Sequence, residues 1–133
     1  MKVKVTPSKV HGNVKIPASK SMAHRALICA SLSDGTSLVS NVTNSKDIEA
    51  TVGCMKALGA IIKQIDETTY EVTGTNLFKQ EGNITCNANE SGSTLRFLIP
   101  LAACTNAKVK FLGQGRLLQR PMDVYANEFK KQN

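Results

Sequence analysis

Two stretches of this chain begin helices in the same way, SKSMAHR at residues 19–25 and ESGSTLR at residues 90–96. Each places small polar residues before an apolar helix and an arginine one turn inside it. The start of a helix presents unpaired backbone N–H groups and a partial positive charge, which suit an anion such as phosphate. Because the same pattern occurs twice, 71 residues apart, we expect a duplicated anion-binding unit.

The segments around these stretches follow one order of strands and helices. In the first part of the chain, up to residue 73, hydrophobic patterning predicts strands at 2–5, 14–16 and 36–42, helices at 21–33 and 45–58, and a hairpin of strands 60–65 and 70–73. In the rest of the chain it predicts a strand at 84–86, a helix at 91–104, a strand at 108–112, a loop at 113–119 and a helix from Pro121. We therefore expect an α/β fold of βαβαββ repeats, with repeat one at residues 14–74 and a truncated repeat two at residues 83–133.

Length and composition fit one globular domain. The chain has 133 residues, 41% of them hydrophobic, and its longest apolar run, 97–104, is interrupted by Pro100 and too short to cross a membrane. The first residues lack the apolar segment of a secretory signal, so we expect a cytoplasmic protein that does not bind membranes. The four cysteines and two histidines show no metal-ligand spacing, so we expect no metal site and no disulfides, only buried thiols.

The net charge of +7 is concentrated in two segments, residues 1–25 and 108–133. Such a distribution suits anionic small molecules or nucleic acid. Nucleic-acid binding by base stacking needs exposed aromatic residues, and the chain has only six Phe and Tyr and no Trp. The composition therefore favours small anions over nucleic acid.

Three residues of the first helix start are candidates for binding a phosphate. Ser21 and Arg25 lie four residues apart and share a helix face, and Lys20 adds a point charge beside them. The alternative is a serine N-cap with Lys20 and Arg25 merely exposed to solvent. His24, on the same helix, has no obvious partner in the sequence, and we expect it to have no catalytic role.

The second helix start and the following loop supply further candidates. Gly92 corresponds to Ser21 at the 71-residue spacing, and its missing Cβ lets a ligand approach the backbone closely. Arg96 corresponds to Arg25, and Arg116 and Arg120 lie in a glycine-containing loop suited to a second anion. The alternatives are an Arg96 paired with Glu90 and an ordinary surface loop.

Three motifs together resemble a known family. PASKS at 17–21 with RAL at 25–27, NESGSTLRFL at 89–98 and GRLLQRPMD at 115–123 are similar to the N-terminal part of the enolpyruvyl transferases, in particular their shikimate-pathway branch. The resemblance covers the whole chain. It implies transfer of the enolpyruvyl group of phosphoenolpyruvate to the 5-hydroxyl of shikimate 3-phosphate, with release of phosphate and without a cofactor.

The resemblance also implies roles for individual residues. Shikimate 3-phosphate is expected to contact Lys20, Ser21 and Arg25. Phosphoenolpyruvate is expected to contact Lys20, Gly92 and Arg120, with Arg96 as a further candidate. Glu90 departs from the asparagine that many members carry, and its carboxylate would repel phosphoenolpyruvate unless it pairs with an arginine.

The family fold implied by the resemblance is an inside-out α/β barrel of two domains, each with three repeats. About one and a half repeats are then present, residues 1–18 belong with the far domain, and residues 19–133 form part of the N-terminal domain. The general acid and base lie outside these residues. We therefore expect the chain to need the C-terminal part of its own protein, to be inactive alone, and to be a monomer at full length.

Two other functions remain as alternatives. The first is the enolpyruvyl transferase that acts on UDP-N-acetylglucosamine, whose members typically have Lys-Asn where this chain has Lys20-Ser21 and a cysteine where it has Gly115. Both differences favour the shikimate branch. The second is a basic module without enzymatic activity that binds an anion or nucleic acid.

Overall fold

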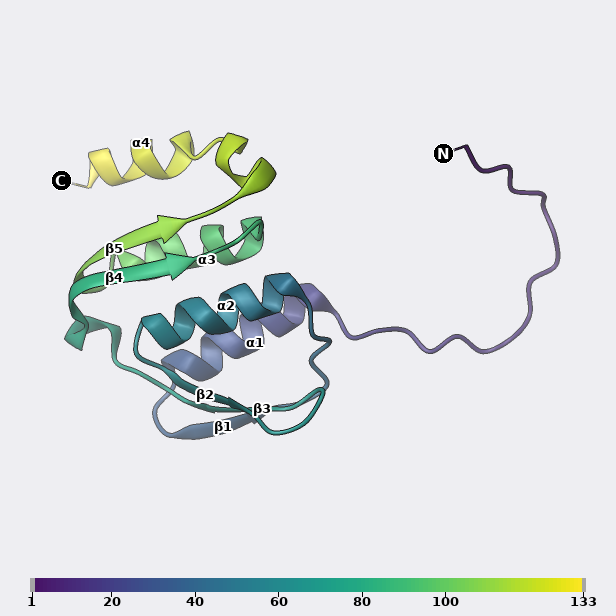
Figure 1. Ribbon diagram of the computed structural model, residues 1–133, viewed down its shortest axis with the longest axis horizontal. Helices are drawn as coiled ribbons and strands as arrows, with labels where there is room; N and C mark the ends of the chain where they lie inside the picture. Colours follow the sequence, from purple (N-terminus) through teal and green to yellow (C-terminus); the bar gives the residue numbers. More distant parts are fainter. Residues whose placement is uncertain (1, 133) are drawn as a thin grey trace.

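The computed structural model describes residues 2–132 and has the predicted α/β character (Figure 1). These residues contain four α-helices, five strands and two short 3-10 helices. In order they are α1 (Lys20–Leu32), β1 (Thr36–Val39), α2 (Lys46–Ala57), β2 (Ile61–Gln64), β3 (Tyr70–Thr73), η1 (Leu77–Lys79), β4 (Glu81–Asn87), α3 (Gly92–Ala102), β5 (Asn106–Leu112), η2 (Gly115–Gln119) and α4 (Asp123–Lys131).

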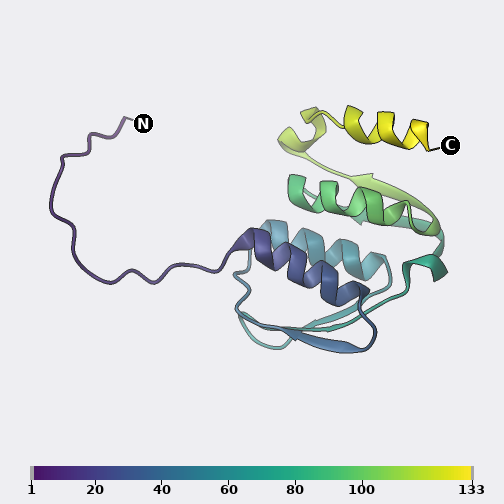
Figure 2. The ribbon, with the colours of Figure 1, turned by 180° about the vertical axis from the view of Figure 1, so that it is seen from behind.

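Helices α1 and α2 cover one face of a three-stranded antiparallel sheet (Figures 1 and 2). The strand order is β1-β3-β2, with β2 and β3 forming the predicted hairpin. Alternate residues of the central strand, Tyr70 and Val72, are buried against the helices, as expected for a sheet with one solvated face. The predicted hairpin is confirmed, whereas the pairing of β1 with β3 was not predicted.

The second unit is a pair of parallel strands, β4 and β5, connected through α3. Both β4 and α3 pack against α2, so one hydrophobic core runs through both units. Its fully buried residues include Leu27, Ile48, Leu58, Val72 and Leu98. Because parallel strands point the same way, the segments that follow β4 and β5 meet at one edge: the Ala88 N–H donates to the Leu112 carbonyl at 2.8 Å, and the Gln114 N–H to the Asn89 carbonyl at 2.8 Å.

Helix α4 is attached to α3 at a gap in the α3 hydrogen-bond ladder. Pro100 lies inside α3 and has no N–H to donate to the Arg96 carbonyl one turn earlier. The Tyr125 hydroxyl of α4 donates to that carbonyl instead, at 3.0 Å. The predicted helix start at Pro121 is two residues early, since α4 begins at Asp123.

Residues 2–19 form no strand, so the strands predicted at 2–5 and 14–16 are wrong. This segment extends away from the folded body (Figures 1 and 2), and its apolar residues are exposed, with Val10 at 91% and Ile16 at 82%. A strand is stable only when a neighbouring strand pairs with its backbone, and no described strand lies beside this segment. Over residues 2–132, the helices are too short or too polar to cross a membrane.

The internal repeat has two registers that differ by one residue. Ser19 and Ser91 cap α1 and α3 with their side chains, which sets the helix starts 72 residues apart. The buried faces instead match at 71 residues, as Leu27 and Leu98 illustrate. Gly92 therefore occupies the first helical position, as Lys20 does in α1, and does not stand in the place of Ser21 relative to the cap.

Burial of the cysteines was only half correctly predicted. Cys54 and Cys86 lie in the core, whereas Cys29 and Cys104 are exposed. Cys29 lies on the outer face of α1, and Cys104 follows the end of α3. The position relative to the core, rather than the residue type, decides burial here.

Candidate functional site

The N-termini of α1, α2 and α3 meet at one end of the molecule, on the right in Figure 1. The Lys20 ammonium at the start of α1 lies 2.5 Å from a carboxylate oxygen of Asp47 at the start of α2. The Thr94 hydroxyl in the first turn of α3 donates to the Asp47 carbonyl at 3.3 Å. Since β4 also ends beside β5 here, three helix starts and two strand ends share one edge. This is where ligands bind in many α/β folds.

The α1 start leaves its candidate residues accessible. The cap is Ser19, whose hydroxyl accepts from the Met22 N–H at 3.4 Å, so the helix has the serine cap of the alternative, and Lys20, Ser21 and Arg25 are all exposed. The Arg25 guanidinium donates to the Ser21 carbonyl at 2.8 Å and lies over the Phe97 ring at 4.9 Å. Arg25 is thereby held on one side by its own helix and on the other by α3.

Gly92 and Arg120 are brought together although 28 residues separate them. A Cβ at Gly92 would overlap the Nη1 atom of Arg120 and would lie 3.2 Å from its Cζ. The guanidinium therefore rests directly on the backbone at the first turn of α3. Only glycine leaves room for this contact, which supports the pairing of these two residues in one site.

The structure gives no side-chain contact that ties Arg96 to the other candidate residues within residues 2–132. The Arg96 carbonyl accepts from Tyr125, and the residue is exposed. Three ion pairs occur within residues 2–132, namely Lys20–Asp47, Lys63–Glu71 and Lys131–Glu128. The alternative of Arg96 paired with Glu90 is therefore wrong.

A cavity of about 500 Å³ opens between the start of α2 and the loops that follow β4 and β5. Half of its lining residues are acids, Asp47 and Glu49 of α2 and Glu90 of the loop before α3; the others are Lys46, Asn89 and Gln114. The Glu90 carboxylate lies against Gly115, where a Cβ would overlap its Oε1 atom, and forms none of the ion pairs named above. The arginine partner proposed for Glu90 is thus not found in the part of the chain that the structure describes.

Sequence reasoning did not assign Asp47 and Glu49 to the site. Their signal was present as two acids in the first turn of a helix. That position is explained by the helix dipole alone, so it does not distinguish a structural carboxylate from one beside a ligand. The distance to Lys20 identifies Asp47 as a site neighbour.

His24 has a partner that was not obvious from the sequence. Its Nδ1 atom lies 2.7 Å from the Thr51 hydroxyl of α2, and the ring is 1% exposed. Burial lowers the pKa of His24, the Asp47 carboxylate opposes this shift, and Lys20 and Arg25 add to it. At neutral pH the ring is therefore uncharged.

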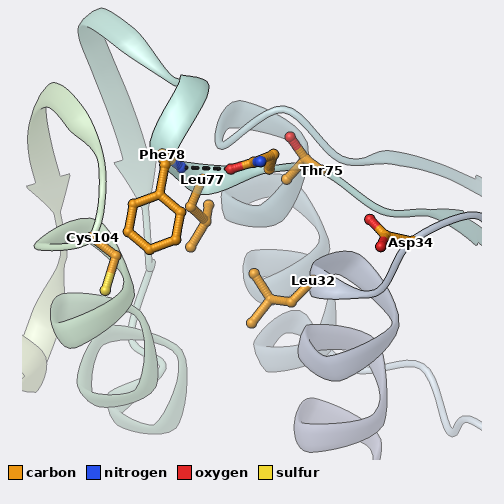
Figure 3. A pocket seen from close by; sticks show the side chains of 7 residues that line it. Leu32, Asp34, Thr75, Leu77, Phe78 and Cys104 are labelled. Atoms are coloured by element: carbon orange, nitrogen blue, oxygen red, sulfur yellow. Dashed lines mark hydrogen bonds between the residues drawn. The ribbon is translucent and has the colours of Figure 1, made fainter.

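A second cavity, of about 340 Å³, lies at the C-terminal end of α1 (Figure 3). Figure 3 shows Leu32, Leu77 and the Phe78 ring around it, with Asp34 at the rim. The lining contains no basic residue; it consists of Leu32, Asp34, Thr75, Asn76, Leu77, Phe78 and Cys104. This cavity does not suit an anion.

A sequence model of the family described as EPSP synthase (3-phosphoshikimate 1-carboxyvinyltransferase) matches residues 4–133. The chain belongs to the EPSP synthase family. A 3-phosphoshikimate 1-carboxyvinyltransferase of Clostridium perfringens (strain SM101 / Type A) is 50% identical over 131 residues, which is 98% of this chain and 31% of that protein. The enzyme of the same name from Clostridioides difficile (strain 630) is 46% identical over 142 residues, 98% of this chain and 32% of that protein.

Solved structures of EPSP synthase from Acinetobacter baumannii share the fold. One has a TM-score of 0.76 at 21% identity over 87% of this chain, and another a TM-score of 0.78 at 20% identity over 90% of it. Each match covers 27% of the solved chain. The expected family and the expected part of an inside-out α/β fold are confirmed, and the chain spans about a third of the length of the curated relatives it matches.

Proposed function

We propose that this chain, as part of a longer protein, binds shikimate 3-phosphate and phosphoenolpyruvate for enolpyruvyl transfer between them. The observation that carries the proposal is the meeting of three helix starts with Lys20, Arg25 and Arg120 at one edge of the fold. Backbone N–H groups and fixed cations together suit two phosphorylated substrates. Membership of the EPSP synthase family favours shikimate 3-phosphate over UDP-N-acetylglucosamine as acceptor.

The two helix starts divide the substrates between them in this proposal. Lys20, Ser21 and Arg25 at the start of α1 bind shikimate 3-phosphate. Gly92 and Arg120 at the start of α3 bind phosphoenolpyruvate, which Lys20 also contacts and to which Arg96 is a further candidate contact. Asp47 at the start of α2 pairs with the Lys20 ammonium, and the remaining two N–H groups of that ammonium stay available to anions.

In the proposed reaction, the 5-hydroxyl oxygen of shikimate 3-phosphate adds to C2 of phosphoenolpyruvate while C3 takes up a proton. The tetrahedral intermediate then loses phosphate and a proton from C3 to leave the enolpyruvyl ether. The residues of this chain hold both anions in reach of each other and stabilise the charge on the departing phosphate. We expect the acid and base that move the protons to come from outside residues 1–133.

The remaining expectations about the whole protein stay predictions. They are a cytoplasmic location, a monomeric state, no nucleic acid as partner, and the assignment of residues 1–18 to another domain. The exposed apolar side chains of this N-terminal segment support the last of these, because such residues are normally buried against a partner surface.

A chimera tests the proposed function. This chain replaces the matching region of the C. perfringens relative, with which it shares 50% identity, and phosphate release is measured with both substrates. We expect release that depends on both substrates, and Lys20→Ala to raise the KM for shikimate 3-phosphate at least 10-fold. Lys56→Ala is the matched control, since Lys56 is an exposed base at the far end of α2 and its loss is expected to leave KM unchanged.

Three outcomes contradict the proposal. They are a folded chimera that releases no phosphate, one that uses UDP-N-acetylglucosamine in place of shikimate 3-phosphate, and Lys56→Ala acting like Lys20→Ala. Nucleic-acid binding whose affinity falls steeply with salt would instead support the basic module. The 133-residue chain by itself is expected to release no more phosphate than a control without protein.

A further inference from the structure

Four buried side chains form a continuous chain of hydrogen bonds across the three helices that meet at the site. The His24 Nδ1 atom of α1 lies 2.7 Å from the Thr51 hydroxyl of α2, which lies 2.7 Å from the Thr94 hydroxyl of α3. The Thr94 hydroxyl is in turn 2.7 Å from that of Ser91, the cap of α3. None of the four residues is more than 2% exposed. We call them the hydroxyl relay.

The far end of the hydroxyl relay determines the direction of its hydrogen bonds. Thr94 has one hydroxyl proton, and two acceptors compete for it, the Asp47 carbonyl at 3.3 Å and the Ser91 hydroxyl at 2.7 Å. With that proton used there, we infer that Thr51 donates to Thr94 and that the Thr51 oxygen accepts from the His24 ring. His24 is then the neutral tautomer with its proton on Nδ1.

The other ring nitrogen agrees with this direction. The Nε2 atom of His24 is buried and has no hydrogen-bond partner within residues 2–132. With the proton on Nδ1, the unpaired atom is an acceptor, and a buried acceptor without a partner is tolerated more often than a buried donor. Burial also lowers the pKa of the ring and so keeps it uncharged. The Lys20 and Arg25 charges lower this pKa further, whereas the Asp47 carboxylate raises it.

We propose that His24 is a positioning residue, whose Nδ1–H orients the hydroxyl relay and thereby holds the first turn of α3 against α1. The relay begins one turn after Lys20 and ends at Ser91, directly before Gly92. It connects the α1 start assigned to shikimate 3-phosphate with the α3 start assigned to phosphoenolpyruvate. This inference rests on the proposed function for its catalytic consequence, but not for the bond direction.

Nuclear magnetic resonance of the imidazole nitrogens in the 133-residue chain tests the bond direction without reference to activity. We expect a neutral ring with its proton on Nδ1 at pH 7. A proton on Nε2 overturns the inference. Hydrogen exchange of the Thr94 N–H, which donates to the Ser91 hydroxyl at 3.2 Å, gives a second measurement on the same chain.

Two substitutions separate positioning from simple structural support. The amide nitrogen of His24→Asn lies close to the place of Nδ1 and can donate to Thr51, whereas that of His24→Gln lies near the place of Nε2. We expect His24→Gln to speed exchange of the Thr94 N–H at least 10-fold and His24→Asn to leave it within threefold of wild type. The matched control is Ser31→Ala, which removes a buried 2.7 Å hydrogen bond to the Leu27 carbonyl inside α1, away from the relay.

In enzymes, a small displacement of a substrate-positioning element slows the reaction greatly, and the chimera tests whether His24 acts in this way. We expect His24→Gln to lower kcat at least 10-fold per folded molecule, His24→Asn to stay within threefold of wild type, and Ser31→Ala to lower only Tm. Equal losses in the two His24 variants, or an unchanged kcat in both, overturn the inference. If the unsubstituted chimera releases no phosphate, the proposed function fails, while ring tautomer and amide exchange still decide the inference.

Discussion

At position 92 the absence of a side chain decides how closely Arg120 approaches the start of α3. The predicted consequence of Gly92→Ala is a displaced guanidinium, because the new Cβ would overlap Nη1. Measured in the chimera, the KM for phosphoenolpyruvate should rise at least 10-fold, and that for shikimate 3-phosphate by less. The loss corresponds to about 1.4 kcal/mol of binding free energy.

Gly53→Ala is the matched control for this substitution. Gly53 lies inside α2, and a Cβ added there would meet open space, since no atom comes within 4 Å of it. Alanine there should raise the free energy of unfolding by about 0.5–1 kcal/mol and leave both KM values unchanged. A similar KM in Gly92→Ala and wild type would contradict the assignment of Gly92 to the site.

His24 gives the chain a pH-dependent stability. Burial lowers its pKa in the folded state, so below about pH 6.5 the unfolded chain binds the extra proton more readily than the folded chain. The free energy of unfolding should therefore fall from pH 7 to pH 5, by at most about 1.4 kcal/mol per pH unit from this group. Urea unfolding measured across this range tests the sign.

Substitution identifies the group responsible for that slope. His24→Asn keeps the donor to Thr51 and removes the titrating ring, so it should flatten the dependence between pH 7 and 5. His11→Asn is the control, because His11 lies in the exposed N-terminal segment outside the folded body. A slope that survives His24→Asn contradicts the prediction.

At the scale of the elements, a hydrogen bond from Tyr125 connects α4 to α3 at the Arg96 carbonyl, which Pro100 leaves without its helical N–H donor. Tyr125→Phe removes the donor to the Arg96 carbonyl and should cost about 0.5–1.5 kcal/mol of unfolding free energy. Pro100→Ala restores a helical N–H to that same carbonyl. In the Pro100→Ala background the tyrosine substitution should therefore cost at least about 0.5 kcal/mol less.

A double-mutant cycle by urea unfolding measures this coupling. The four proteins are wild type, the two single variants and the double variant. An equal cost of Tyr125→Phe in both backgrounds would show that the hydroxyl does not replace the N–H that Pro100 lacks.

At the scale of the whole molecule, the N-terminal segment is exposed and pairs with no strand that the structure describes. Trypsin should cut the 133-residue chain first after Lys4, Lys9 or Lys15, because the segment is exposed and unpaired with any described strand. Mass spectrometry of early digestion products tests this. In the chimera the same sites should be cut at least 10-fold more slowly, if residues 1–18 pack with another domain.

Two results would contradict this prediction. Early cleavage inside residues 20–132 would show that the folded body opens more easily than the segment. Equal cleavage rates in the chain and the chimera would contradict the assignment of residues 1–18 to another domain.

Helix positions were the most predictable part of the fold. The starts of α1, α2 and α3 fall within one residue of the predicted positions, since Ser19, Ser45 and Ser91 cap them with their own side chains. The strand predictions at 2–5 and 14–16 failed, although the pattern of β-branched residues is present, because strand formation depends on a neighbour that local sequence does not reveal.

The candidate site was predictable as residues and not as an arrangement. Lys20, Arg25 and Gly92 follow from helix-start patterns, which act over a single turn. The closeness of Asp47 to Lys20 and of Thr51 to His24 joins residues 27 positions apart on separate helices. Neither hydrophobic periodicity nor a helix cap predicts contacts between residues so far apart in the sequence.

The sequence by itself therefore determined the helix starts, the buried faces and the family, because caps and hydrophobic periodicity act between residues close along the chain. Only the tertiary structure decided that three helix starts meet at one edge and that Arg120 rests on Gly92. It alone also showed that a buried histidine connects α1 to the cap of α3 through two threonines. These contacts depend on how elements pack across the core and on parallel pairing of β4 and β5, and such long-range geometry has no local signature.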